Sequence, residues 1–152
     1  MLLFNNTRSE EAQLKALKII WVMLTAVVMA GCGGVIKGKP AAERAVVAFH
    51  QLFNEGKFDE IWKDADPKFR GASTRENYDE FIGAVSRKLG KVTSTSNAGW
   101  NIRTINFKTT IVMTQKTAFE NGGGTETFTF ALDGTNAVLL GWNVQSTDLI
   151  TK

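Results

Sequence analysis

Residues 125–132 read Thr-Glu-Thr-Phe-Thr-Phe-Ala-Leu, and their order indicates what the second half of the chain forms. Phe128, Phe130 and Leu132 occupy every second position, which places their side chains on one face of a β-strand. The residues between them are threonine and alanine, which are smaller or more polar. The stretch therefore predicts a strand with one apolar, core-facing side.

The regions on both sides of this strand repeat the alternation. Residues 109–119 and 137–145 alternate with a period of two. The segments between these strands, Asn121 to Gly124 and Asp133-Gly134, have the composition of hairpin turns. The sequence predicts three consecutive antiparallel strands joined by tight turns.

An earlier strand region starts after Gly90, where the composition becomes rich in β-branched and aromatic residues. Residues 91–96 and 100–106 are its two pieces. Asn97, Ala98 and Gly99 interrupt them, and a bulge or a wide loop fits there.

Residues 40–90 have the spacing of amphipathic helices. We expect a first helix over residues 41–54, with Pro40 in its first turn and a stop at Gly56. A second, shorter helix is expected from Phe58 and ends at Pro67. The first helix has an apolar stripe of Ala42, Val46, Phe49 and Phe53.

The third predicted helix has the clearest pattern. Ser73 or Thr74 can cap its start, and Gly90 can end it. We expect Phe81 to be buried between this helix and the sheet. Because no helix separates two strands, the order of elements predicts an α+β fold. The apolar stripe consists of Tyr78, Phe81, Ile82, Val85 and Leu89.

The N-terminal region resembles an export signal. Basic Arg8, Lys15 and Lys18 precede an uncharged apolar stretch, residues 19–30, and small residues lead to Cys32, the only cysteine. A signal that ends on a cysteine resembles the lipobox of bacterial lipoproteins.

That resemblance implies that residues 1–31 are cleaved as a signal peptide and that Cys32 carries the lipid, including palmitate. Residues 32–39 are then the lipidated cysteine and a flexible tether, and residues 40–152 form one domain. Gly33, in place of an acidic retention signal, implies delivery to the outer membrane if the source has one. The alternatives are an uncleaved N-terminal anchor, since 18 residues from Ile19 to Ile36 carry no charge, and simple secretion.

A second resemblance covers the domain. The stretches 109–122, 125–130 and 139–146, with Glu55 to Trp62 and Arg87 to Lys91, are similar to small secreted domains of the NTF2-like, cystatin-like superfamily. The resemblance implies N-terminal helices packed on a curved antiparallel sheet of about four strands, with a cone-shaped cavity between them. Some relatives with this fold are enzymes, so function has to be argued from the site.

Three residues are candidates for a ligand cavity in that cone: His50, Tyr78 and Trp142. His50 lies about 100° around the helix from Phe49, so we expect it at the rim or in water. Tyr78 stands at the boundary of an apolar stripe. Trp142 shares a face with apolar strand residues, which points it toward the helices.

Other polar groups are expected to be structural. Glu76, Asp79 and Glu80 form a solvated helix face, with Arg75 able to pair with Asp79. Asp64 and Asp66 lack further metal ligands nearby. The run Gly122-Gly123-Gly124 precedes a strand, whereas a phosphate loop precedes a helix, so it predicts a hairpin turn.

The composition excludes little else. The chain has 18 basic and 15 acidic residues with a net charge of +3, and their signs are interspersed. We expect no cofactor, no bound metal and no nucleic-acid partner. The sequence predicts a membrane-anchored lipoprotein of the cell envelope that faces the periplasm.

Its domain is expected to be a non-enzymatic binding module for an envelope protein or a small apolar ligand. One alternative is a small NTF2-like enzyme of the isomerase or hydro-lyase type, which uses a residue in the cone. A second is an accessory module whose open sheet face docks on a larger envelope assembly.

Overall fold

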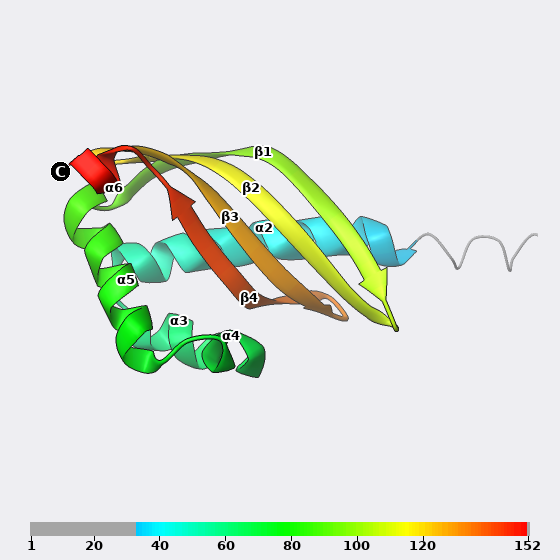
Figure 1. Cartoon of the computed structure of the whole chain (residues 1–152). Helices are drawn as coiled ribbons and strands as arrows, with labels where there is room; N and C mark the ends of the chain where they lie inside the picture. The colour runs from blue at the N-terminus through cyan, green and yellow to red at the C-terminus, as the bar shows by residue number, and fades with distance from the viewer. Residues whose placement is uncertain (1–32, 152) are drawn as a thin grey trace, which may run out of the picture. The chain divides into compact units, whose positions relative to one another are not determined.

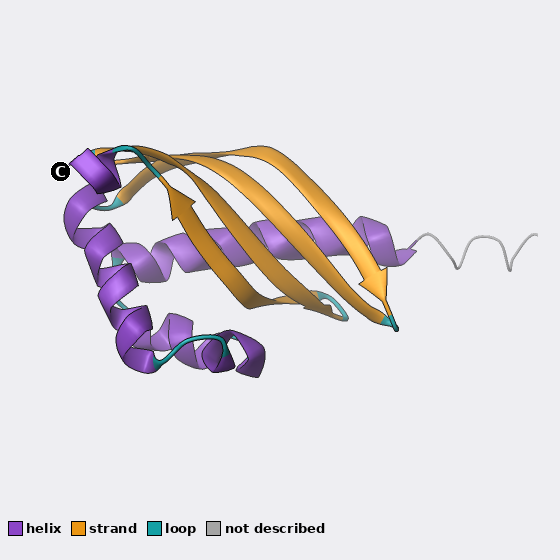
Figure 2. Cartoon of the chain, in the orientation of Figure 1, coloured by secondary structure: helices purple, strands orange, loops and turns teal. Residues whose placement is uncertain are grey.

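The computed structural model describes residues 33–151, with side chains from residue 38 onward. The chain divides into two units after Ile36, and the fold described here is that of residues 37–151. The predicted signal peptide and Cys32 lie outside the described residues. Figures 1 and 2 show the elements, which in chain order are α2 (Gly33–Asn54), α3 (Phe58–Asp64), α4 (Pro67–Gly71), α5 (Arg75–Leu89), β1 (Val92–Ile105), β2 (Lys108–Phe119), β3 (Gly122–Asp133), β4 (Asn136–Gln145) and α6 (Asp148–Thr151).

The four strands form an antiparallel meander in the order β1-β2-β3-β4, so the α+β prediction is confirmed. Met113 of β2 faces Phe128 of β3, which in turn faces Trp142 of β4. The two strand segments predicted over residues 91–96 and 100–106 form one strand, β1. The predicted irregularity is confirmed, because the register with β2 shifts between Asn97 and Gly99.

The first helix is longer than predicted. It begins at Gly33, so the expected tether over residues 33–39 is helical and Pro40 lies inside the helix. Proline removes one backbone donor, the one that would bond to the carbonyl of Ile36, and the helix continues despite that loss. Gly38 explains the close approach to the sheet, since a Cβ there would come within 2.5 Å of Leu132 and 3.5 Å of Ile102.

The remaining predicted helices are confirmed, with one addition. Helix α3 follows the prediction, and α4 is an extra turn in which the Asp66 side chain accepts a hydrogen bond from the amide of Lys68. Thr74 caps α5 by accepting a hydrogen bond from the amide of Asn77, and Gly90 ends it with a φ of 77°. A φ in this range favours glycine.

Helix α2 lies along one face of the sheet (Figure 1). Its Phe49 ring contacts Phe128 at 5.1 Å and Trp142 at 4.9 Å between ring centroids. These contacts place the core between α2 and the inward side chains of β2, β3 and β4. In the described part of the chain, no helix is long and apolar enough to cross a membrane.

The prediction that Phe81 is buried is wrong. Its side chain is 39% exposed, whereas Ile82 beside it is fully buried. The stripe of α5 is centred on Ile82, Val85 and Leu89, so Phe81 lies at its edge and packs against Trp142 at 5.4 Å.

Candidate functional site

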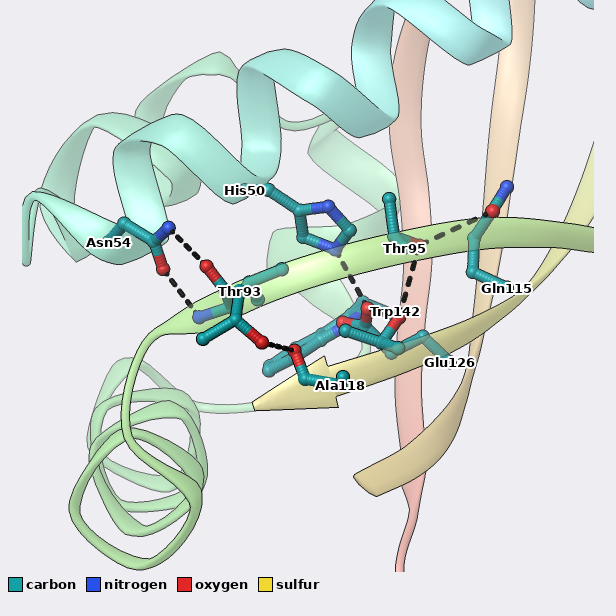
Figure 3. Close-up of polar contacts among 10 residues, drawn as sticks. His50, Asn54, Thr93, Thr95, Gln115, Ala118, Glu126 and Trp142 are labelled. Atoms are coloured by element: carbon teal, nitrogen blue, oxygen red, sulfur yellow. Dashed lines mark hydrogen bonds and ion pairs between the residues drawn. The ribbon is translucent and has the colours of Figure 1, made fainter. Parts of the chain in front are cut away.

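Glu126 is a fully buried carboxylate on the core-facing side of β3. One oxygen, Oε2, lies 2.5 Å from Thr117 Oγ1 and 2.7 Å from His50 Nε2, and Oε1 accepts a hydrogen bond of 2.9 Å from Trp142 Nε1. Figure 3 shows His50 from α2 and Trp142 from β4 converging on Glu126. An ionised carboxylate only accepts hydrogen bonds, so Nε2 of His50 carries its hydrogen when Glu126 is charged.

The contacts continue from the acid toward the surface. Thr117 Oγ1 lies 3.2 Å from Thr95 Oγ1, which donates to Gln115 Oε1 at 3.4 Å. Thr95 is exposed on β1. Among the described residues, no buried polar side-chain atom lacks a hydrogen-bond partner. The group is therefore fully satisfied, as a buried charge requires.

The prediction that His50 lies at the rim or in water is wrong, because the residue is 7% exposed. The apolar arc of a helix on a sheet is commonly wider than 100°. Ala42, Val46 and Phe53 lie between Phe49 and His50 around the helix axis, so the buried arc runs from Phe49 to His50 and is not centred on Phe49. The imidazole packs edge-on against Phe128 at 5.6 Å and reaches Glu126.

Beside this group lies a pocket walled by aromatic rings, with a volume of about 290 Å³. Trp62 and Tyr78 are 4.9 Å apart on one side, and Phe81 and Trp142 are 5.4 Å apart on the other. Ser73 and Asn77 supply its polar groups. The other lining residues are Phe69, Ala72, Leu140 and Gly141.

The Trp62 and Tyr78 side of the pocket is held by polar contacts behind the rings. The Tyr78 hydroxyl donates to the Phe58 carbonyl at 3.0 Å, and burial raises the pKa of Tyr78, with the nearby Arg75 opposing that rise. The Arg75 guanidinium lies 5.7 Å from the centre of the Trp62 ring and pairs with Asp79 and Asp59. The hydrogen bonds of Arg75 to Asp79 and to Asp59 raise its pKa, and the bond to Asp79 has the larger effect.

Trp142 joins the pocket to the buried acid. Its ring lines the pocket, and its Nε1–H is held by Glu126. The structure thus brings Tyr78 and Trp142 together around one pocket, while His50 lies behind the wall and acts through Glu126. The position of the Trp142 ring depends on that carboxylate.

Sequence reasoning missed Glu126, although the alternation contained a signal. Glu126 stands two residues before Phe128 and thus on the face of Phe128 and Phe130. A charged residue at a core-facing position is rarely buried without partners. The presence of a charged residue on this apolar face could have identified Glu126 from the sequence.

The prediction of a solvated acidic face on α5 is confirmed. Glu76, Asp79 and Glu80 are exposed, and Arg75 pairs with Asp79 at 2.8 Å. Within residues 33–151, no group of three or more His, Cys, Asp or Glu could hold a metal ion.

Two segments near turns differ in detail from the sequence interpretation. The first β-hairpin turn after β2 is Glu120-Asn121, so Gly122 to Gly124 begin β3. Asp66 caps α4, whereas Asp64 lines a second, apolar hollow together with Ala45 and Ala48.

No family model matches the sequence, and no match was found among curated proteins. The solved structure of Bdellovibrio bacteriovorus Bd1075 aligns with a TM-score of 0.44 and 13% identity. The alignment covers 70% of this chain and 40% of that chain, so this chain spans well under two thirds of its length.

Proposed function

We propose that this protein is a lipid-anchored domain of the cell envelope that binds a small, planar, apolar ligand in the aromatic pocket. The proposal includes acylation of Cys32, orientation toward the periplasm, and an NTF2-like arrangement in which the pocket lies at the mouth of the cone. The aromatic pocket is the observation that carries the binding role.

The chemistry of the pocket selects the ligand class. Aromatic rings favour offset-stacked or edge-to-face contact with another flat ring system. Binding sites for small molecules combine apolar walls with a few polar groups that set orientation. Ser73 and Asn77 are those groups here, so a polyaromatic or heteroaromatic molecule with one hydroxyl or carbonyl fits the lining.

The same geometry favours binding over catalysis. An acid-base residue needs a free lone pair or proton directed at the substrate. Both oxygens of Glu126 accept hydrogen bonds from protein donors, and neither Glu126 nor His50 lines the aromatic pocket. Their contacts suit a role in positioning Trp142, so the isomerase or hydro-lyase alternative receives less support.

The binding role is tested by untargeted mass spectrometry of small molecules that remain bound to the purified full chain. Ala72 lines the pocket and has ordinary helical backbone angles, so Ala72→Phe fills the pocket without backbone strain. Ala118→Phe, at an exposed position on β2, is the matched control.

We expect an aromatic compound bound to the wild type and to Ala118→Phe, and at least a tenfold loss in Ala72→Phe. Equal retention in all three proteins would contradict this pocket as the binding site.

The anchor is tested separately by metabolic labelling with a fatty acid. Cys32→Ala removes the only thiol in the chain. We expect labelled wild type and an unlabelled variant. Equal labelling of both proteins, or an unlabelled wild type, rejects the lipoprotein assignment and leaves the pocket proposal intact.

A further inference from the structure

The β1–β2 hairpin ends in an apolar tip that the fold leaves uncovered. The Phe107 side chain is fully exposed and Ile105 is 54% exposed. Asn106 and Phe107 form the turn with φ values of 49° and 61°. Two-residue hairpin turns of this kind favour glycine at such positions, because a side chain there is strained.

Phe107 therefore buries no apolar surface in the folded domain, and its backbone adopts an unfavourable conformation in the turn. A large exposed aromatic at a strained position is explained by a contact outside the domain. The charges around it indicate the chemistry of that contact. Arg103 and Lys108 flank the tip and are exposed, and Asp133 follows Leu132, the β3 residue that pairs with Thr109.

The tip also lies at the end of the domain where the chain enters from Cys32. In the first turns of α2, Gly38 faces Ile102 and Leu132, since a Cβ at Gly38 would lie 3.5 Å and 2.5 Å from their side chains. These two residues are three residues and one residue from the ends of their strands. Within residues 37–151, Figure 1 shows the N-terminal part of α2 and the β1–β2 hairpin at the same end of the fold. Lys37 follows Cys32 by five residues, which span at most about 18 Å.

We infer that the tip of Ile105, Asn106 and Phe107 inserts into the interface of an anionic lipid bilayer, as a second membrane contact beside the proposed acyl chain. Aromatic rings suit the headgroup boundary, and flanking Arg and Lys suit anionic lipids. This inference rests on the proposed anchor for its orientation.

The test uses the full chain, purified from membranes and reconstituted into vesicles of phosphatidylethanolamine and phosphatidylglycerol that contain brominated acyl chains. Phe107→Cys carries an environment-sensitive fluorophore, and acylation of Cys32 leaves the new thiol as the only free one. Ala118→Cys is the matched control, because it is exposed and lies ten residues along β2 from Lys108, or about 33 Å.

We expect strong quenching of the fluorophore at residue 107 and none at residue 118. The quenching at residue 107 should fall at least threefold when phosphatidylcholine replaces phosphatidylglycerol, and the Arg103→Ser/Lys108→Ser variant should lose this dependence on the lipid. Equal exposure of both probes to an aqueous quencher, in a chain whose mass shows the acyl groups, overturns the inference.

The mass of the purified chain separates the two proposals. A chain without acyl groups refutes the anchor. In that case Cys32→Ala keeps residue 107 as the only thiol, and the same quenching in mixed vesicles decides whether the tip inserts, because vesicle-bound protein can be isolated by flotation. Failure to float at low salt then counts against insertion.

Discussion

A fully buried carboxylate is stable only when protein donors replace the water it has lost. Glu126 has donors from three elements, namely His50, Thr117 and Trp142. We predict that Glu126→Ala lowers the free energy of unfolding by about 3 to 5 kcal/mol, since truncation leaves these donors without an acceptor. Glu126→Gln should cost less, about 1 to 2 kcal/mol, because one oxygen remains.

Urea unfolding of the two variants checks this prediction, with the exposed Glu76→Ala as the control. A domain of this size is stable by only about 5 to 15 kcal/mol, so the loss is easily measured. If Glu126→Ala unfolds at the same urea concentration as Glu76→Ala, the buried acid does not stabilise the fold.

Tyr78 is the only tyrosine, so the absorbance of phenolate reports on it alone. Burial raises its pKa above the ordinary value of about 10. The folded state thus favours the neutral phenol, and this contribution to stability is complete below about pH 10 and is lost as the pH rises further. We predict that phenolate forms only together with unfolding.

An alkaline titration followed by both absorbance and circular dichroism checks this. The Phe69 ring packs against Tyr78, so Phe69→Leu should loosen the pocket wall there. In this variant we expect phenolate formation to precede unfolding. Phenolate that forms near pH 10 in a protein with native circular dichroism would place the hydroxyl in water.

At the scale of elements, the β1–β2 hairpin combines a cost in stability with exposed apolar surface. A non-glycine residue in the left-handed region costs about 1 to 2 kcal/mol, part of which is offset because glycine loses more entropy on folding. We predict that Phe107→Gly raises the free energy of unfolding by about 0.5 to 1 kcal/mol, measured by urea unfolding.

The control is Ile150→Gly, at another exposed apolar position. Phe58 packs on the core, so Phe58→Gly would not serve as a control. A loss of stability above about 1 kcal/mol in Phe107→Gly would show that the Phe107 ring has a partner within the protein.

The elements themselves were largely predictable from sequence because their signals are local. The period of two over residues 125–132 and the cap at Thr74 depend only on neighbouring residues, and both are confirmed. The start of α2 was not predictable, because Pro40 is a common first-turn residue and its tolerance inside a helix depends on the rest of the fold.

The site was predictable only in part. The face of Trp142 follows from strand alternation, whereas the burial of His50 depends on how far the sheet extends around α2. Phe81 was assigned to the core from the helix stripe alone, but the position of the sheet leaves it at the pocket edge. Contacts between distant elements decide these cases, and a local pattern does not contain them.

At the scale of the whole molecule, the structure combines a sheet with one covered face, a satisfied polar group inside it and an aromatic pocket beside that group. The Glu126 carboxylate holds one edge of the Trp142 indole, and the ring of Trp142 lines the pocket. Ligand binding in that pocket should therefore be detected at Trp142 and at Trp62, which lies opposite.

The most direct test is a nuclear magnetic resonance titration of the indole N–H signals with 2-naphthol as the probe. Trp100 is 46% exposed on β1 and does not line the pocket, so it controls for unspecific stacking. Tryptophan-to-phenylalanine variants assign the signals. The account predicts saturable shifts of the Trp62 and Trp142 signals and none at Trp100. Shifts at Trp100 alone, or at no tryptophan, would contradict it.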